Sequence, residues 1–203
     1  MPRALLISPS GVPGGAERAI TGLARHLPDQ GWQVRAVLLQ PGPLRDWLEG
    51  VGCPVEVIEA GRTRQLPRTG AVVARLAHLA RGADIVISNQ SKGHVYGGMA
   101  ARIAHRPAVW WQHGTPTRSA IESVARLNPS AVVVAGSRDS VAAQGRLTPH
   151  RRVALVHPGV DVGGIRARSG TGFALREAHG WGEATLVGIV GRLQEWKGQD
   201  VFL

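Results

Sequence analysis

The fold is decided at residues 4–17, which read ALLISPSGVPGGAE. A short apolar run there ends in a loop that holds three glycines and two prolines. Beyond the loop, apolar residues return at helical spacing, beginning with Ala19, Ile20 and Leu23, and predict one buried helix face. Glycines let backbone N–H groups approach a ligand closely, and a helix N-terminus favours an anion. The loop is therefore either a ligand-binding turn or a tight strand-to-helix turn that binds nothing.

The same alternation of strand and helix continues along the chain. Short apolar runs bounded by Gly, Pro or Asp predict strands, and stretches with one apolar face predict helices. After the strand at 4–8, further strands are expected at 33–39, 54–58, 84–88, 108–111, 131–135 and 153–156. Helices are expected at 44–51, 71–80, 94–104, 120–127 and 137–147, with a loop over 60–70. About seven strands in strict alternation with helices predict an α/β fold with a doubly wound, mostly parallel, Rossmann-like sheet.

In such a sheet, ligands bind beyond the carboxyl ends of the strands, because the loops that follow the strands meet at that edge. The sequence places five segments with polar residues or glycines there. They are 11–17, 88–92, 113–116, residue 137 and 157–161.

Composition limits the classes of protein to consider. A chain of 203 residues with 43% hydrophobic residues fits one large domain, or one domain and part of a second. The single cysteine, Cys53, excludes an internal disulfide framework and is compatible with a reducing cytoplasm. No apolar run approaches the roughly 20 residues of a membrane span, and the N-terminus lacks the layout of a signal peptide. We therefore expect a cytoplasmic protein.

The formal net charge of +10 raises the hypothesis of nucleic-acid binding. We discount it, because the basic residues are arginines apart from Lys92 and Lys197 and are spread along the chain. No aromatic residues alternate with them to stack on bases, so no specific nucleic acid is expected as a partner. The local cluster Arg62, Arg64 and Arg68 instead suggests a peripheral contact with anionic lipid at the inner face of the membrane.

The alternation of strand and helix patterns predicts that a second domain begins near the end of the chain. The first domain is expected at 1–165, followed by a linker and a short helix at 166–182. Residues 184–190, ATLVGIV, then predict a strand that leads into GRLQEWKG at 191–198. A strand with half a helix cannot bury itself alone. Residues 183–203 are therefore expected to be the first strand and loop of a truncated C-terminal domain.

Four short motifs occur in a fixed order. They are Gly-Gly-Ala-Glu at 14–17, Gln-His-Gly at 112–114, Pro-Gly-Val-Asp at 158–161, and Val-Gly-Arg-Leu at 190–193 followed by Lys-Gly at 197–198. Over nearly the whole chain, their order and separations resemble the N-terminal half of a GT-B glycosyltransferase of family 4 (group 1). The last motif is the most specific, because it opens the C-terminal domain of that family. The resemblance implies that residues 183–203 begin this donor-binding domain. The resemblance implies a retaining, metal-independent enzyme that uses a nucleotide-sugar donor.

The resemblance also implies roles for individual residues. Arg192 and Lys197 are expected to face the donor diphosphate, where positive charge stabilises the negative charge that develops on the leaving group. His113 is expected beside the transferred sugar as the catalytic residue, where it supplies a hydrogen bond or a basic nitrogen. Gly14 and Gly15 are expected to let the first helix approach the donor phosphate or sugar.

Four further polar residues are candidates for the same edge. Glu17 either caps the first helix or contacts a ligand, and Ser137 either caps a later helix or contacts the acceptor. Asn89 and Lys92, together with Ser91 between them, follow the end of a strand and are candidate acceptor contacts. No paired carboxylates indicate an inverting hydrolase. No His or Cys spacing indicates a metal site, so we expect no metal and no cofactor.

The function implied by the resemblance is the transfer of a sugar to a carbohydrate, lipid or small-molecule acceptor, with retention of configuration. In this family the C-terminal domain carries a glutamate pair that grips the donor. We therefore expect the 203-residue chain to need that domain as a partner and to be inactive alone.

Two other classes of protein remain as alternatives. An NAD(P)-binding oxidoreductase domain shares the opening strand-loop-helix, but it requires G-x-G-x-x-G and an acidic residue about 20 positions later. Here the glycines fall at 11, 14 and 15, and the next strand ends at Leu39 and Gln40 without an acid. A non-catalytic basic module would follow from the net charge, and its affinity for nucleic acid would fall steeply with salt.

Overall fold

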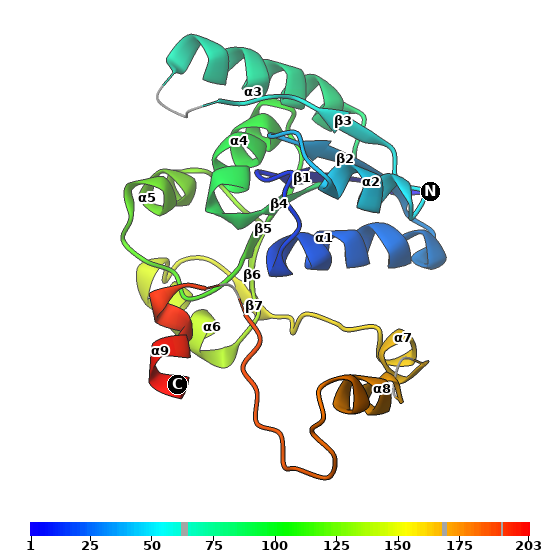
Figure 1. Ribbon diagram of the computed structural model, residues 1–203. Helices are drawn as coiled ribbons and strands as arrows, with labels where there is room; N and C mark the ends of the chain where they lie inside the picture. The colour runs from blue at the N-terminus through cyan, green and yellow to red at the C-terminus, as the bar shows by residue number, and fades with distance from the viewer. Residues whose placement is uncertain (62–64, 168–169, 192) are drawn as a thin grey trace. The chain divides into compact units, whose positions relative to one another are not determined.

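The computed structural model describes residues 1–61, 65–167, 170–191 and 193–203. The chain divides into two compact units, Met1–Gly159 and Val160–Leu203. The first unit holds the sheet and the helices around it (Figure 1).

Within the described residues, the first unit is built on a seven-stranded sheet in which every neighbouring pair of strands is parallel. The strands follow one another across the sheet in the order β3-β2-β1-β4-β5-β6-β7 (Figure 1). They are β1 (Arg3–Ser8), β2 (Gln33–Leu38), β3 (Val55–Val57), β4 (Ile85–Asn89), β5 (Ala108–Gln112), β6 (Val132–Ala135) and β7 (Val153–Leu155). The predicted α/β fold with a parallel, Rossmann-like sheet is confirmed.

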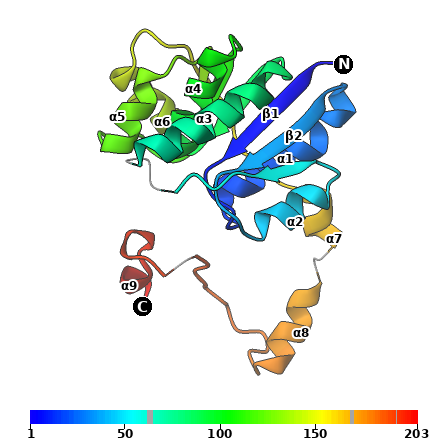
Figure 2. The same cartoon turned by 90° about the horizontal axis from the view of Figure 1, so that it is seen from above.

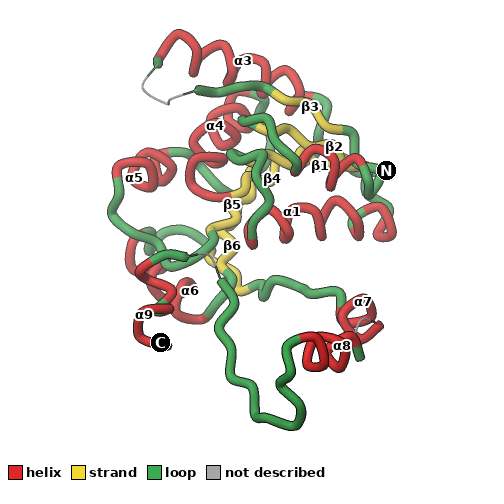
Figure 3. Tube along the Cα trace, viewed as in Figure 1, coloured by secondary structure: helices red, strands yellow, loops and turns green. Residues whose placement is uncertain are grey.

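Helices connect successive strands, as Figure 3 shows in red between the yellow strands. They are α1 (Gly15–His26), the short 3₁₀ helix η1 (Pro28–Gln30), α2 (Leu44–Glu49), α3 (Leu66–Arg81), α4 (Gln90–Ile103), α5 (Ala120–Leu127) and α6 (Arg138–Leu147).

The helices cover both faces of the sheet, because successive side chains of a strand point to opposite faces. Leu6 of β1 packs in a cluster with Ile20 of α1 and Leu44 of α2. Ile7, the next residue, packs in a second cluster with Leu76 of α3 and with residues of α4. Helices α3 and α4 lie side by side over that second cluster (Figures 1 and 2).

The loops that follow β1 and β2 pack closely against each other at two glycines, Gly11 and Gly42. A Cβ atom at Gly11 would lie 2.4 Å from the carbonyl oxygen of Gln40 and 2.5 Å from the carbonyl carbon of Pro41. A Cβ atom at Gly42 would lie 2.4 Å from the carbonyl oxygen of Gly11. That same oxygen accepts a hydrogen bond from the backbone N–H of Leu44 at 2.8 Å. Backbone therefore packs directly on backbone, and only glycine fits at either position.

Replacing Gly11 by Ala is expected to lower the free energy of unfolding by about 1–3 kcal/mol, because the added methyl group must push two backbone segments apart. Urea unfolding followed by circular dichroism measures the change. Gly22→Ala is the matched control: a Cβ atom there meets nothing within 4 Å, so alanine should stabilise α1 by about 0.5–1 kcal/mol. Equal effects of the two substitutions would show that the close approach at Gly11 carries no strain.

A histidine is buried in the core of the first unit. The ring of His94, on α4, stacks on the indole of Trp110 with centroids 5.0 Å apart and an angle of 3° between the planes. Neither ring nitrogen makes a hydrogen bond of normal geometry within the described residues. Burial, with a smaller contribution from the charge of Arg151, lowers the pKa of His94 to about 4. His94 is therefore neutral at neutral pH, and its ring packs in the core as an aromatic side chain would.

His94 is expected to make the fold sensitive to acid. The unfolded chain takes up a proton at His94 as the pH falls through about 6.5, whereas the folded chain does not until about pH 4, so stability is lost between these values. Between about pH 7 and pH 4.5, the wild-type free energy of unfolding should fall by roughly 2–3 kcal/mol more than that of His94→Phe. Urea titrations at both pH values measure this difference. If the free energy of unfolding fell by the same amount in the wild type and in His94→Phe, the prediction would be wrong.

Two helices begin earlier than the sequence predicts. The loop expected over 60–70 is wrong from Leu66 onward, because α3 begins there with Pro67 in its first turn. Proline fits the first turn of a helix, where its missing N–H group has no partner to lose. Helix α4 begins at Gln90 instead of residue 94, directly after the extended Asn89.

The second unit contains α7 (Val162–Ala167), α8 (Thr171–Ala178), η2 (Glu195–Lys197) and α9 (Gln199–Phe202). Residues 184–190, which the sequence predicts to be a strand, have no regular secondary structure. A strand needs a neighbour for its N–H and C=O groups, and the described part of this unit offers none. The domain boundaries expected from the sequence stay predictions.

Candidate functional site

The candidate site lies at the carboxyl edge of the sheet, which we define as the edge where the parallel strands end. The loop after β1 leads into α1, and β4 continues directly into α4 (Figure 1). Strand β1 lies between β2 and β4, so the connections after β1 and β4 lead away from each other across the sheet. Ligands of doubly wound folds bind at such a point.

His113 follows β5 at this edge and is half-buried. Its ring stacks on the indole of Trp111, with centroids 5.3 Å apart and planes 23° apart. Its Nε2 atom lies 2.7 Å from Oδ1 of Asn89, at the end of the neighbouring strand β4. Burial lowers the pKa of His113 to about 4, so the ring is neutral at neutral pH.

Asn89 connects His113 to the first turn of α1. The side chain of Asn89 is fully buried, and its Nδ2 atom donates a hydrogen bond of 3.3 Å to the carbonyl oxygen of Ala16. The structure thus joins, by one direct hydrogen bond, two candidates that the sequence placed after separate strands. Their roles toward a ligand stay predictions.

Gly14 and Gly15 differ in their surroundings. Gly14 is the N-cap residue of α1, and a Cβ atom there would lie 2.8 Å from Oε2 of Glu17. A Cβ atom at Gly15 would meet nothing within 4 Å. Gly14 therefore makes room for a buried carboxylate of its own helix, and the start of α1 remains open at Gly15.

Glu17 is 5% exposed and faces the first residue of α4. Its Oε1 atom accepts a hydrogen bond of 2.6 Å from Nε2 of Gln90. Gln90 has φ of +59°, a left-handed conformation that costs a non-glycine residue of order 1 kcal/mol. The strained residue thus ties the starts of α1 and α4 together. Sequence reasoning missed Gln90, because nothing in its neighbours signals a positive φ.

Sequence reasoning also missed a buried chain of hydrogen bonds beneath His113. Ser91 Oγ donates to Gln112 Oε1 at 3.0 Å, and Gln112 Nε2 donates to Glu122 Oε1 at 3.2 Å. The other oxygen of Glu122 accepts from the backbone N–H of Thr117, and Arg126 lies 3.7 Å from the same carboxylate. This chain fixes the backbone on both sides of His113. The signals in the sequence were that Gln112 belongs to the Gln-His-Gly motif and that Ser91 follows the end of a strand at the same edge.

Lys92 and Ser137 make contacts within the first unit. Lys92 Nζ donates to the carbonyl oxygen of Gly61 at 3.3 Å, and Ser137 Oγ accepts from the backbone N–H of Ser140 at 3.1 Å, as an N-cap of α6. His157 Nδ1 lies 3.0 Å from the carbonyl oxygen of Gly136. The structure does not bring Lys92 or Ser137 into hydrogen-bond contact with His113 among the described residues.

The two residues expected at the donor diphosphate belong to the second unit. Lys197 is the last residue of η2 and is exposed, whereas Arg192 lies outside the described residues. Arg62 and Arg64 of the basic cluster also lie outside them. The described arginines near that cluster face carboxylates: Arg68 lies 3.6 Å from Glu59, and Arg75 Nε lies 2.9 Å from Glu56 Oε1.

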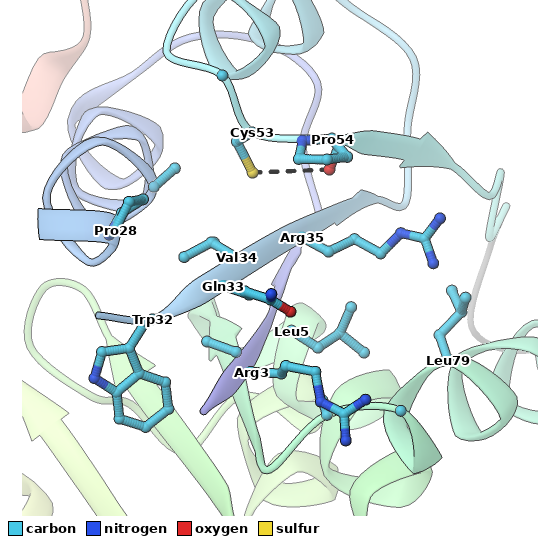
Figure 4. Close-up of a pocket in the computed structure, with 15 residues that line it drawn as sticks. Arg3, Leu5, Pro28, Trp32, Gln33, Val34, Arg35, Cys53, Pro54 and Leu79 are labelled. Carbon is cyan, nitrogen blue, oxygen red and sulfur yellow. Dashed lines mark hydrogen bonds between the residues drawn. The ribbon is translucent and has the colours of Figure 1, made fainter. Parts of the chain in front are cut away.

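A cavity of about 550 Å³ lies at the opposite, amino edge of the sheet (Figure 4). Val34 and Arg35 of β2 point in opposite directions within it, and Cys53 lies above that strand in the view. None of the residues that line it comes from the five sequence-predicted segments at the carboxyl edge. We therefore place the candidate site at the carboxyl edge and treat this cavity as separate from it.

Cys53 lines that cavity and is buried, and burial raises its pKa to about 11. At about pH 8 iodoacetamide should therefore modify Cys53 about 100-fold more slowly in the folded chain than in the urea-unfolded chain, because the thiolate is the reactive species. Ser123→Cys, on the exposed surface of α5, supplies a reference thiol in the same protein. If both thiols reacted at one rate in the folded chain, the cavity would be shown to open freely to solvent.

Two features are absent from the described residues. These residues contain no group of three or more His, Cys, Asp or Glu side chains that could hold a metal ion. No described helix has the length and apolar character needed to cross a membrane.

The family model for Glycosyltransferase Family 4 matches residues 13–163, which is more than half of the chain. The chain belongs to glycosyltransferase family 4. The match begins at the glycine loop and includes the His113 turn and Pro-Gly-Val-Asp. The family predicted from the four motifs is confirmed, and membership favours a glycosyltransferase over the oxidoreductase and basic-module alternatives. No curated protein matches the chain.

Solved structures agree with the family. The chain superposes on Anabaena HepE in complex with UDP and glucose with a TM-score of 0.78 and 27% identity, over 99% of this chain and 56% of HepE. HepE in complex with UDP-glucose gives a TM-score of 0.77 and 28% identity, over 98% and 55%. A glycosyltransferase from Rickettsia africae ESF-5 shares the fold, with a TM-score of 0.74 and 17% identity, over 98% and 55%. The chain spans about half the length of these structures and has the fold of a GT-B N-terminal domain.

Proposed function

We propose that this chain is the N-terminal, acceptor-side part of a glycosyltransferase that moves a sugar from a nucleotide-sugar donor to an acceptor. The match to family 4 over residues 13–163 carries the proposal. A UDP-sugar is the proposed donor, since HepE, which is 28% identical over nearly the whole chain, was solved with UDP-glucose. The acceptor is a carbohydrate, a lipid or a small molecule.

In this proposal His113 is the catalytic residue and the transfer retains the anomeric configuration. His113 lies at the carboxyl edge, beside the open start of α1, with Asn89 and Trp111 holding its ring. Such a group can hydrogen-bond a hydroxyl of the transferred sugar. The start of α1 favours the negative charge of the donor, because the first N–H groups of a helix have no partners within the helix.

The remaining parts of the proposal concern the leaving group. When the bond between sugar and diphosphate breaks, negative charge develops on the diphosphate. Arg192 and Lys197 are proposed to stabilise it, which would make a metal ion unnecessary. Because the chain corresponds to 56% of HepE, we further propose that the 203-residue chain alone does not complete the reaction.

The test uses a chimera in which this chain is followed by the part of HepE that the superposition does not cover. The folded chimera should consume UDP-glucose in the presence of EDTA, and His113→Ala should lower turnover by about 100-fold or more, the usual effect of losing a transition-state hydrogen bond. Release of UDP measures turnover.

His78→Ala is the matched control for that experiment, because His78 is an exposed histidine near the C-terminal end of α3. It should leave turnover unchanged. Full turnover in the His113→Ala chimera would assign His113 a structural role. A folded chimera that consumes no nucleotide sugar would contradict the proposed function itself.

A further inference from the structure

We propose that Asn89 is a positioning residue, which fixes the proton of the His113 ring on Nε2 and keeps Nδ1 as the hydrogen-bond acceptor for a sugar hydroxyl. The positioning itself follows from the contacts of this chain. Only the identity of the hydroxyl rests on the proposed function.

The first step concerns the orientation of the Asn89 amide. The carbonyl oxygen of Ala16 can only accept a hydrogen bond, so the group that lies 3.3 Å from it must be the donating NH₂ group of Asn89. The amide oxygen then faces His113. A flipped amide would place its oxygen against the Ala16 oxygen and leave two acceptors facing each other.

Burial makes that flipped arrangement costly. Asn89 is 0% exposed, so no bulk water can satisfy a misoriented amide group. An unsatisfied buried polar group costs about 1–3 kcal/mol, and a flip would leave the amide oxygen of Asn89 facing another acceptor with no donor. The Ala16 carbonyl belongs to the first turn of α1 and thus selects one orientation of Asn89.

The second step concerns the proton on His113. An amide oxygen only accepts, so the 2.7 Å contact requires that Nε2 of His113 carries a hydrogen. The ring is neutral at neutral pH, because burial lowers its pKa to about 4. A neutral imidazole carries one N–H, so Nδ1 has a lone pair and acts as an acceptor.

The third step concerns the surroundings of Nδ1. Within the described part of the chain no hydrogen bond reaches this atom, and the half-buried ring leaves it accessible. Stacking on Trp111 at 5.3 Å limits rotation of the ring. An accessible acceptor of fixed direction suits a hydroxyl donor, and sugars present hydroxyl groups. A tautomer with its proton on Nδ1 would instead repel that hydrogen.

The experiment measures the tautomer directly in the 203-residue chain. Histidine is labelled with ¹⁵N, and long-range ¹H–¹⁵N spectra at about pH 7 distinguish protonated from unprotonated ring nitrogens. His113→Ala identifies the signals of His113. We expect one tautomer, with the proton on Nε2. A proton on Nδ1, or a mixture such as free histidine shows, overturns the proposal.

Variants of Asn89 separate positioning from general stability. Asn89→Leu removes the acceptor, so the signals of His113 should move toward the mixture found in free histidine. Asn89→Asp keeps an acceptor beside Nε2 and should restore the single tautomer, although it loses the donor to Ala16. Ser123→Ala, on the exposed face of α5, should leave the signals of His113 in place. An unchanged tautomer in Asn89→Leu contradicts the proposal.

Turnover in the HepE chimera gives a second measurement. Asn89→Leu should lower turnover about tenfold or more, and Asn89→Asp should recover part of the loss. If the chimera consumes no nucleotide sugar while the spectra show the Nε2 proton, the proposed function fails and the positioning by Asn89 stands. If the chimera is active and Asn89→Leu has full turnover, the positioning has no part in the reaction.

Discussion

The structure of the first unit depends on the pairing of β1 with β2 on one side and with β4 on the other. All three strands run in parallel, so each ends at the same edge and each needs a helix to return the chain to the opposite edge. Because the chain leaves β1 toward one side of the sheet and leaves β4 toward the other, the two loops separate there. The start of α1, the side chain of Asn89 and the ring of His113 meet at this opening.

Rigidity at that opening comes from small residues and from buried polar groups. Gly11 and Gly42 let two loops pack backbone against backbone. The Gln112–Glu122 hydrogen bond anchors the turn that carries His113 to α5. The first contact restrains the loop that leads to α1, and the second restrains the turn that carries His113. A preorganised edge of this kind lowers the conformational entropy lost on binding.

The sequence predicts the strands of the first unit well, because each is a short apolar run with clear breakers. It also places the candidate residues on one edge, since parallel strands end together. It does not predict that Asn89 bonds to His113, which lies 24 positions later in the chain, because the strand order decides that contact. Nor does it predict the positive φ of Gln90, where the hydrogen bond to Glu17 outweighs local preference. The start of α3 did have a local signal, Pro67 in the first turn, which the prediction of a loop over 60–70 did not use. The strand expected over 184–190 lacks a partner in the described residues, and pairing cannot be read from one segment alone.

The single, buried thiol has a practical consequence for following this protein in solution. Cys53 lies at the amino edge, far along the strands from the candidate site, and it is the only cysteine in the sequence. A cysteine introduced at the exposed Arg118, in the segment between His113 and α5, would accept a fluorescent label without any change at Cys53. Because Cys53 stays unlabelled, the fluorescence would come only from the introduced cysteine. Movements of the carboxyl edge could then be measured at one chosen position in each variant.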